Sequence, residues 1–182
     1  LDPPEPTIGA WANYGLGTLN ENLPKFIAMG PRFFDRSDAH YLGPEYEAVK
    51  LKVDPDNPLD FSTPEGDLPL AEQRVAFDLV NRLNKLSRRA YPNDAGLEAR
   101  IKSYELAYRM QSEVPGVIDF GAETEATKNL YGFDQKATKP FGEQLLAARR
   151  FVEKGVRFVQ IMHGGGAAGA WDQHAGLKKG HA

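Results

Sequence analysis

Cysteine is absent from the 182 residues, and neither one sign of charge nor a long apolar run dominates the chain. Without cysteine, the chain cannot form disulfides, thiolate metal sites or a cysteine nucleophile. The 22 basic and 25 acidic side chains give a net charge of −3. This balance argues against nucleic acid as a partner, because nucleic-acid binding requires a basic face. No apolar run approaches the roughly 18 residues that a membrane span requires.

The length suits one domain with its own core and is too short for two. The chain starts at Leu1 without an initiator Met or a signal segment, and the stretch Lys178–Ala182 ends without a proline or a cap. We therefore expect residues 1–182 to form a single incomplete domain, an internal part of a larger protein.

Helix caps and apolar runs predict the order of the elements. Thr7 is a good N-cap for a helix over Ile8–Leu16, and Asp94 is a good N-cap for a later one. Residues 30–69 form a proline-rich, irregular excursion of the kind that usually lies over the surface. The other predicted elements are strands over Phe26–Met29 and Val156–Met162, and helices over Leu70–Arg89, from Asp94 onward, over Glu123–Leu130, and from about Pro140 to Gly155.

Three of these helices carry apolar residues at helical spacing, which predicts the faces that pack on the rest of the protein. The predicted stripes are Ala76, Leu79, Leu83 and Leu86; Leu97, Ile101, Tyr104 and Tyr108; and Phe141, Leu145, Ala148 and Val152.

The order helix, glycine, apolar strand at Gly155 is typical of the returning half of a parallel α/β unit. We therefore predict an α/β fold in which helices flank a mainly parallel sheet that is incomplete in this chain. Two strands are few for so many helices, and the simplest reading is that other strands lie outside these residues. A helical bundle with one stray strand is the alternative.

The segment after the strand Val156–Met162 contains three of the four histidines. Ligands of open α/β sheets bind at the carboxyl ends of the strands, so we expect a site here. Gly164, Gly165 and Gly166 allow the backbone to approach a ligand closely. Trp171 could form a wall of the pocket or stack on a sugar-like substrate.

Asp172 and His174 point the same way if the chain is extended, as one shared ion would require. A carboxylate with an imidazole suits Zn²⁺ or Mn²⁺ better than Ca²⁺, and His163 is a further candidate ligand. The alternative readings are a flexible glycine turn, a chance Asp-x-His pair and a core tryptophan. His40 and His181 are expected on the surface. Arg109 could reach an anion or pair with Glu105 or Glu113, and Arg149 and Arg150 are expected on a solvated face.

Several stretches resemble the domain-of-unknown-function 1501 family, which is often labelled sulfatase-like. They are residues 7–17, 20–27, 104–111, 130–132 and 141–150, and above all 155–160 leading to Trp171-Asp172-Gln173-His174. The resemblance follows the family's order over essentially the whole chain. It implies kinship with the alkaline phosphatase superfamily, a mainly parallel sheet, and a site for phosphate or sulfate esters that uses a divalent metal ion (Zn, Mn or Ca).

By this resemblance, Asp172 and His174 are the best candidate metal ligands and His163 the second. The substrate would be a small-molecule or polysaccharide ester, and the protein would be bacterial and exported to the periplasm or beyond. Family members also carry an earlier segment with an acidic metal motif and a nucleophile region, and a later acidic and His-containing segment. Because neither segment is present here, we expect no turnover by this chain alone. A non-catalytic exported binding or surface protein on the same scaffold is the alternative function.

Overall fold

A three-stranded parallel sheet lies at the centre of the structure, a computed structural model that describes residues 5–30, 39–54 and 70–163. Its strands are β1 (Phe26–Met29), β2 (Val49–Lys50) and β3 (Phe158–Ile161), in the order β2-β1-β3. In the central strand, Ile27 pairs with Val49 on one side and with Val159 on the other. The sheet confirms the predicted α/β class and excludes the helical bundle.

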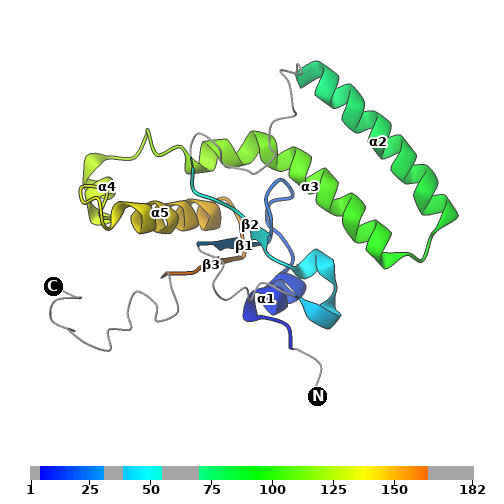
Figure 1. The fold of residues 1–182 in the computed structure, drawn as a ribbon, viewed down its shortest axis with the longest axis horizontal. Helices are drawn as coiled ribbons and strands as arrows, with labels where there is room; N and C mark the ends of the chain where they lie inside the picture. The colour runs from blue at the N-terminus through cyan, green and yellow to red at the C-terminus, as the bar shows by residue number, and fades with distance from the viewer. Residues whose placement is uncertain (1–4, 31–38, 55–69, 164–182) are drawn as a thin grey trace.

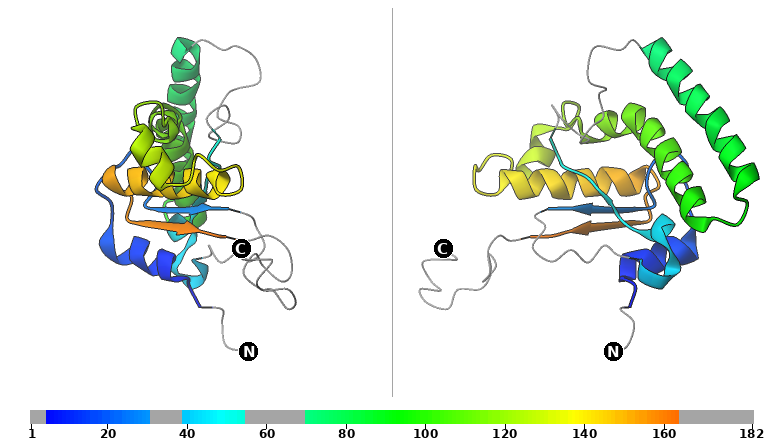
Figure 2. Two further views of the ribbon diagram at one scale, coloured as in Figure 1. Left: turned by 90° about the vertical axis from the view of Figure 1, so that its left-hand side faces the viewer. Right: turned by 45° about the vertical axis from the view of Figure 1, so that its right-hand side comes forward.

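Helices cover both faces of this sheet (Figures 1 and 2). One face is covered by α1 (Ile8–Leu16), which contacts β1 and β3. On the other face, α5 (Lys139–Glu153) packs on β3, and α3 (Ala95–Ile118) packs on α5. The remaining helices are α2 (Leu70–Ala90), α4 (Glu125–Leu130) and the short 3₁₀ turns η2 (His40–Leu42) and η3 (Pro44–Tyr46). Across the described ranges, no helix is long and apolar enough to cross a membrane.

The helix boundaries follow from local chemistry, as predicted. The Thr7 hydroxyl accepts a hydrogen bond from the Ala10 amide at 3.3 Å, and the Asp94 carboxylate accepts one from the Leu97 amide at 2.9 Å. Both bonds satisfy amides that a helix N-terminus would otherwise leave unpaired. After α5, Gly155 adopts a φ of 96°, a conformation that favours glycine and turns the chain toward β3.

The core lies between the sheet and the helices α3 and α5. Its buried side chains come from β1, from the C-terminal half of α3 and from one face of α5. Phe151 and Leu146 are completely buried. The core residues are Leu23, Ile27, Met29, Leu51, Met110, Val114, Val117, Ile118, Phe120, Leu146, Ala147, Phe151 and Val156.

The buried face of α5 differs from the predicted one. Leu145 and Val152 are exposed, whereas Leu146 and Phe151 fill the core. Apolar residues stand next to each other at both places. At 100° per residue, the pair Leu145 and Val152 and the pair Leu146 and Phe151 point to opposite sides of the helix, so either face could have been the buried one. The sheet beneath the helix selects the second. Of the stripe predicted on α3, Ile101 is buried but Tyr104 is 62% exposed, because the core contacts lie further along the helix.

The sequence predicts Arg149 and Arg150 on a solvated face, but their side chains are only 35% and 20% exposed and join α5 to the segment around the C-terminus of α3. Both guanidinium groups contact the Glu123 carboxylate, at 2.7 and 3.3 Å. The hydrogen bond to Glu123 is the main reason why the pKa of Arg149 is raised above its ordinary value. Arg150 also donates to the carbonyl oxygens of Gly116 and Asp119. These bonds satisfy carbonyl groups near the C-terminus of α3.

We expect Gly142→Ala to lower the free energy of unfolding by about 1–3 kcal/mol, as overpacking does. Gly142 is a buried residue of α5, and an added Cβ would overlap the backbone carbonyl of Tyr131. The matched control is Gly15→Ala in α1, where a Cβ would meet no atom within 4 Å. There, the better helix propensity of alanine should raise stability by about 0.5–1 kcal/mol. Urea unfolding of both variants measures the difference, and equal effects would contradict the packing of α5 against Tyr131.

Candidate functional site

The carboxyl edge of the sheet is the site that the sequence predicts. Since all three strands are parallel, their carboxyl ends meet at this edge. Beyond the end of β3, the Met162 amide donates a hydrogen bond to the Met29 carbonyl at 2.8 Å, which ties the ends of β3 and β1 together. The next residue in the chain is His163. The predicted position of this histidine, directly after a parallel strand, is confirmed.

Gly30 allows the two chain segments to approach each other closely at this edge. Its φ is 106°, and an added Cβ would overlap the carbonyl group of Met162. A residue with a side chain would be strained by this φ and would also push the strand ends apart. Glycine at this position therefore keeps the backbone that leads to His163 next to the end of β1.

The imidazole of His163 is exposed and lies against the ring of Phe141. The two ring centroids are 4.2 Å apart, and the ring planes meet at 77°, an edge-to-face contact that is favourable for aromatic pairs. Phe141 belongs to the first turn of α5, which packs on β3. The helix that covers the sheet thus holds the histidine at the carboxyl edge.

The other predicted site residues lie outside the described ranges. They are the candidate metal ligands Asp172 and His174, and the candidate substrate-binding residues Gly164, Gly165, Gly166 and Trp171. His163 is therefore the member of the predicted site whose surroundings are known, and the convergence of the others on it stays a prediction. Within residues 5–30, 39–54 and 70–163, there is no group of three or more His, Asp or Glu side chains arranged to hold a metal ion. His40 is exposed in η2, as expected.

A polar pocket at the opposite, amino edge of the sheet was not predicted. It has a volume of about 590 Å³ and lies between α1, η3 and α3. Asn13, which lines it, is only 3% exposed and donates to the Glu45 carbonyl at 3.5 Å. Arg109 pairs with neither of the glutamates proposed for it. It donates instead to the Glu21 carbonyl at 2.9 Å, and so fastens the loop before β1 to α3.

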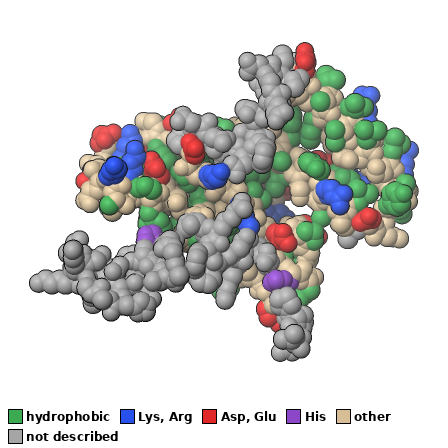
Figure 3. All heavy atoms as spheres, in the orientation of Figure 1, with side chains coloured by type: hydrophobic (Ala, Val, Ile, Leu, Met, Phe, Trp, Pro, Cys, Tyr) green, Lys and Arg blue, Asp and Glu red, His purple; other side chains and the backbone are tan. Residues whose placement is uncertain are grey.

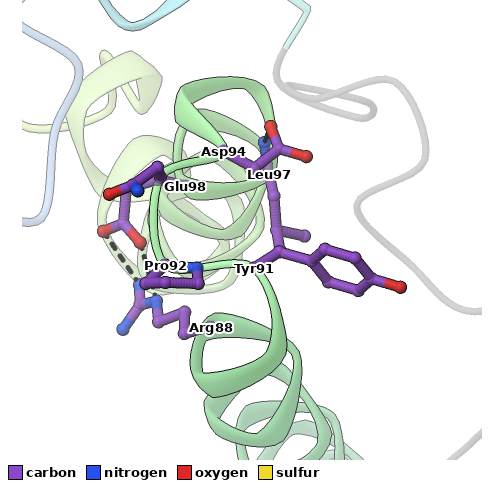
Figure 4. A pocket seen from close by; sticks show the side chains of 7 residues that line it. Arg88, Tyr91, Pro92, Asp94, Leu97 and Glu98 are labelled. Carbon is purple, nitrogen blue, oxygen red and sulfur yellow. Dashed lines mark hydrogen bonds and ion pairs between the residues drawn. The ribbon is translucent and has the colours of Figure 1, made fainter.

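A second hollow lies at the turn between α2 and α3 (Figure 4). In it, the Arg88 guanidinium is directed at the Glu98 carboxylate, with an Nε–Oε2 distance of 2.7 Å, while the ring of Tyr91 points away. The Asp94 carboxylate is engaged as the cap of α3. The charged groups of this hollow are thus paired with other groups of the connection between α2 and α3.

The architecture defines the class of the protein: it is an α/β protein with a small parallel sheet flanked by helices. Comparison with known families then identifies the family. The model of a family described as "Protein of unknown function (DUF1501)" matches residues 2–182, so the chain belongs to this family. No curated protein and no solved structure matched the chain.

Proposed function

We propose that the chain is part of a metal-dependent hydrolase of sulfate or phosphate esters with an alkaline-phosphatase-like fold. One observation carries the proposal: β3 leads directly into His163 at the carboxyl edge of a parallel sheet, and the chain continues to Trp171-Asp172-Gln173-His174. An imidazole and a carboxylate are suitable ligands for Zn²⁺ or Mn²⁺, and the carboxyl edge is where such sheets bind ligands.

In the proposed site, Asp172, His174 and His163 hold a divalent metal ion. When bound, the ion polarises the ester and lowers the pKa of the attacking group. The amides of Gly164, Gly165 and Gly166 bind ester oxygens, since glycine-rich backbone can direct several N–H groups at an anion. Trp171 packs against the organic part of a small-molecule or polysaccharide substrate. The proposal includes export to the periplasm or beyond.

The proposal is tested by expressing the complete gene, because the family's nucleophile region and its further acidic motifs are expected outside these 182 residues. Hydrolysis of an aryl sulfate and an aryl phosphate is measured before and after treatment with EDTA. We expect turnover of at least one ester, its loss with EDTA, and its recovery with added Zn²⁺ or Mn²⁺. Inactivity toward both esters, without bound metal in elemental analysis, would favour the non-catalytic binding protein.

A further inference from the structure

Helix α2 presents a row of aliphatic side chains to solvent. We call this row the α2 stripe. Its large members are between 43% and 70% exposed, and Figure 3 shows hydrophobic side chains with Lys and Arg among them over this helix. Amphipathic helices normally turn such a stripe toward a core, so the α2 stripe differs from what the sequence predicts. It consists of Val75, Ala76, Leu79, Val80, Leu83 and Leu86.

The opposite side of α2 makes the contacts with α3. Phe77 stacks on Tyr108 with ring centroids 3.9 Å apart, and Arg88 pairs with Glu98. On a helix with 100° per residue, Phe77 and Arg88 lie about 160–180° from Leu79. The contacts with α3 therefore fix α2 in an orientation that keeps the stripe outward, and the exposure of the stripe is a consequence of specific packing.

The spacing of the side chains in the α2 stripe suits packing against a second helix. Ala76, Leu79, Leu83 and Leu86 follow the three-and-four alternation of a heptad seam, in which each side chain inserts between four residues of a facing helix. The stripe contains no Trp, Tyr or Phe, the residues that commonly anchor a helix lying on a membrane surface. Regular aliphatic spacing without aromatic anchors favours a helical protein segment over a lipid surface.

The charges beside the stripe indicate the chemistry of the partner. Arg82 and Arg89 each follow a leucine of the seam by three residues, so both lie along the same border of it. Lys85 lies further around the helix on the same side. Of the two acidic residues of α2, Asp78 lies beside this border and Glu72 continues the line of the seam one turn before Ala76, so the border itself is predominantly basic. A complementary partner carries carboxylates along the matching border, since opposite charges at the rim set the choice of partner.

A second copy of the chain does not provide this complement. In an antiparallel pair, Arg82 of one copy would lie opposite Arg82 of the other at the centre of the interface. In a parallel pair, Arg82 of one copy would face Ser87 of the other, because the g position of one helix lies next to the following e position of its partner. Like charges therefore oppose the antiparallel pair, and the parallel pair offers no carboxylate to the basic border.

We propose that the α2 stripe binds an amphipathic helix with an aliphatic seam and an acidic border, so that α2 lies between this helix and α3. This inference is independent of the proposed hydrolase and concerns a surface distant in sequence from the candidate metal ligands. The association buries the exposed aliphatic area and pairs the basic border with carboxylates.

The test uses the whole 182-residue chain and a designed peptide of three heptads with Leu at the a and d positions and Glu at e and g. The matched control peptide has Lys in place of each Glu. Binding is measured by fluorescence anisotropy of the labelled peptides. We expect the Glu peptide to bind, the Lys peptide to bind about tenfold more weakly or worse, and added salt to reduce the difference.

Two variants distinguish specific binding at the α2 stripe from nonspecific adsorption of the peptide. Leu83→Asp should abolish binding of the Glu peptide, while circular dichroism stays unchanged because Leu83 is 54% exposed. The double variant Arg82→Glu with Arg89→Glu should reverse the preference, so that the Lys peptide binds better. Absence of binding by the Glu peptide would overturn the proposal. The proposal would also be overturned if the chain sedimented with vesicles of phosphatidylglycerol and phosphatidylcholine, or formed a dimer in light scattering, and Leu83→Asp abolished that behaviour.

Discussion

Phe151→Ala should lower the free energy of unfolding by about 3–5 kcal/mol, the usual effect of deleting a phenylalanine from a core. Phe151 is completely buried and belongs to the cluster that joins α5 to β1 and α3. Its removal leaves a cavity that the surrounding helices and sheet can close only in part, which is why the effect exceeds the transfer of the ring to water. Urea denaturation followed by circular dichroism measures the change.

The neighbouring residue is the matched control for this prediction. Val152 is 56% exposed, so Val152→Ala should change stability by less than about 0.5 kcal/mol. The pair discriminates between two faces of α5, because the helical pattern of the sequence alone places Val152 in the core. A larger loss from Val152→Ala than from Phe151→Ala would contradict the observed orientation of the helix.

Asp172→Ala and His174→Ala should each weaken the binding of Zn²⁺ or Mn²⁺ by a factor of at least about 10–100, since even the loss of an outer-shell partner has an effect of that size. Isothermal titration calorimetry of the metal-free chain measures the affinities. The reason is that a divalent ion held by a carboxylate and imidazoles loses one of few protein ligands in each variant. His163→Ala should weaken binding in the same direction.

The control for the metal prediction is a histidine of the same chain at another place. His40 is exposed in the 3₁₀ turn η2, and His40→Ala should leave the affinity unchanged. If the Asp172 and His174 variants bind the metal ion with the same affinity as the original chain, these two residues are not its ligands. The alternative function, a binding or surface protein on this scaffold, would then be preferred.

The elements were predictable from the sequence because their boundaries are set locally. The strand over Phe26–Met29 and the helix over Ile8–Leu16 coincide with β1 and α1. Thr7 and Asp94 cap their helices through their own side chains, so the signal lies within a few residues of the boundary. The strand β3 occupies the middle of the range predicted for it.

The strand β2 could not be predicted, because its cause is not local. Val49–Lys50 lies within the proline-rich excursion and is only two residues long. It is a strand because Ile27 and Ala28 provide a partner far away in the sequence, and the Leu51 amide extends the ladder with a bond to the Ala28 carbonyl. The choice of buried face depends on distant contacts in the same way. Leu146 and Leu145 differ in burial only because of what α5 packs against.

Part of the candidate site was predictable for a topological reason. A polar residue that follows an apolar strand in an α/β unit must emerge at the carboxyl edge of a parallel sheet, and His163 does so. Its contact with Phe141 was not predictable, because that contact depends on how far the first turn of α5 extends over the strand end. The role of Gly30 in the close approach of the strand ends was not predicted, because it depends on Met162, which is distant in the sequence.

The most direct test of the central claim follows the four histidines of the chain by nuclear magnetic resonance during titration with Zn²⁺. Two-bond ¹H–¹⁵N spectra of the imidazole rings report the nitrogen that binds the ion. The ring nitrogens of His174 and His163 should shift together and reach saturation at one ion per chain, while those of His40 stay in place. A titration in which His174 and His163 do not respond, or respond no more than His40, would contradict a metal site at the carboxyl edge.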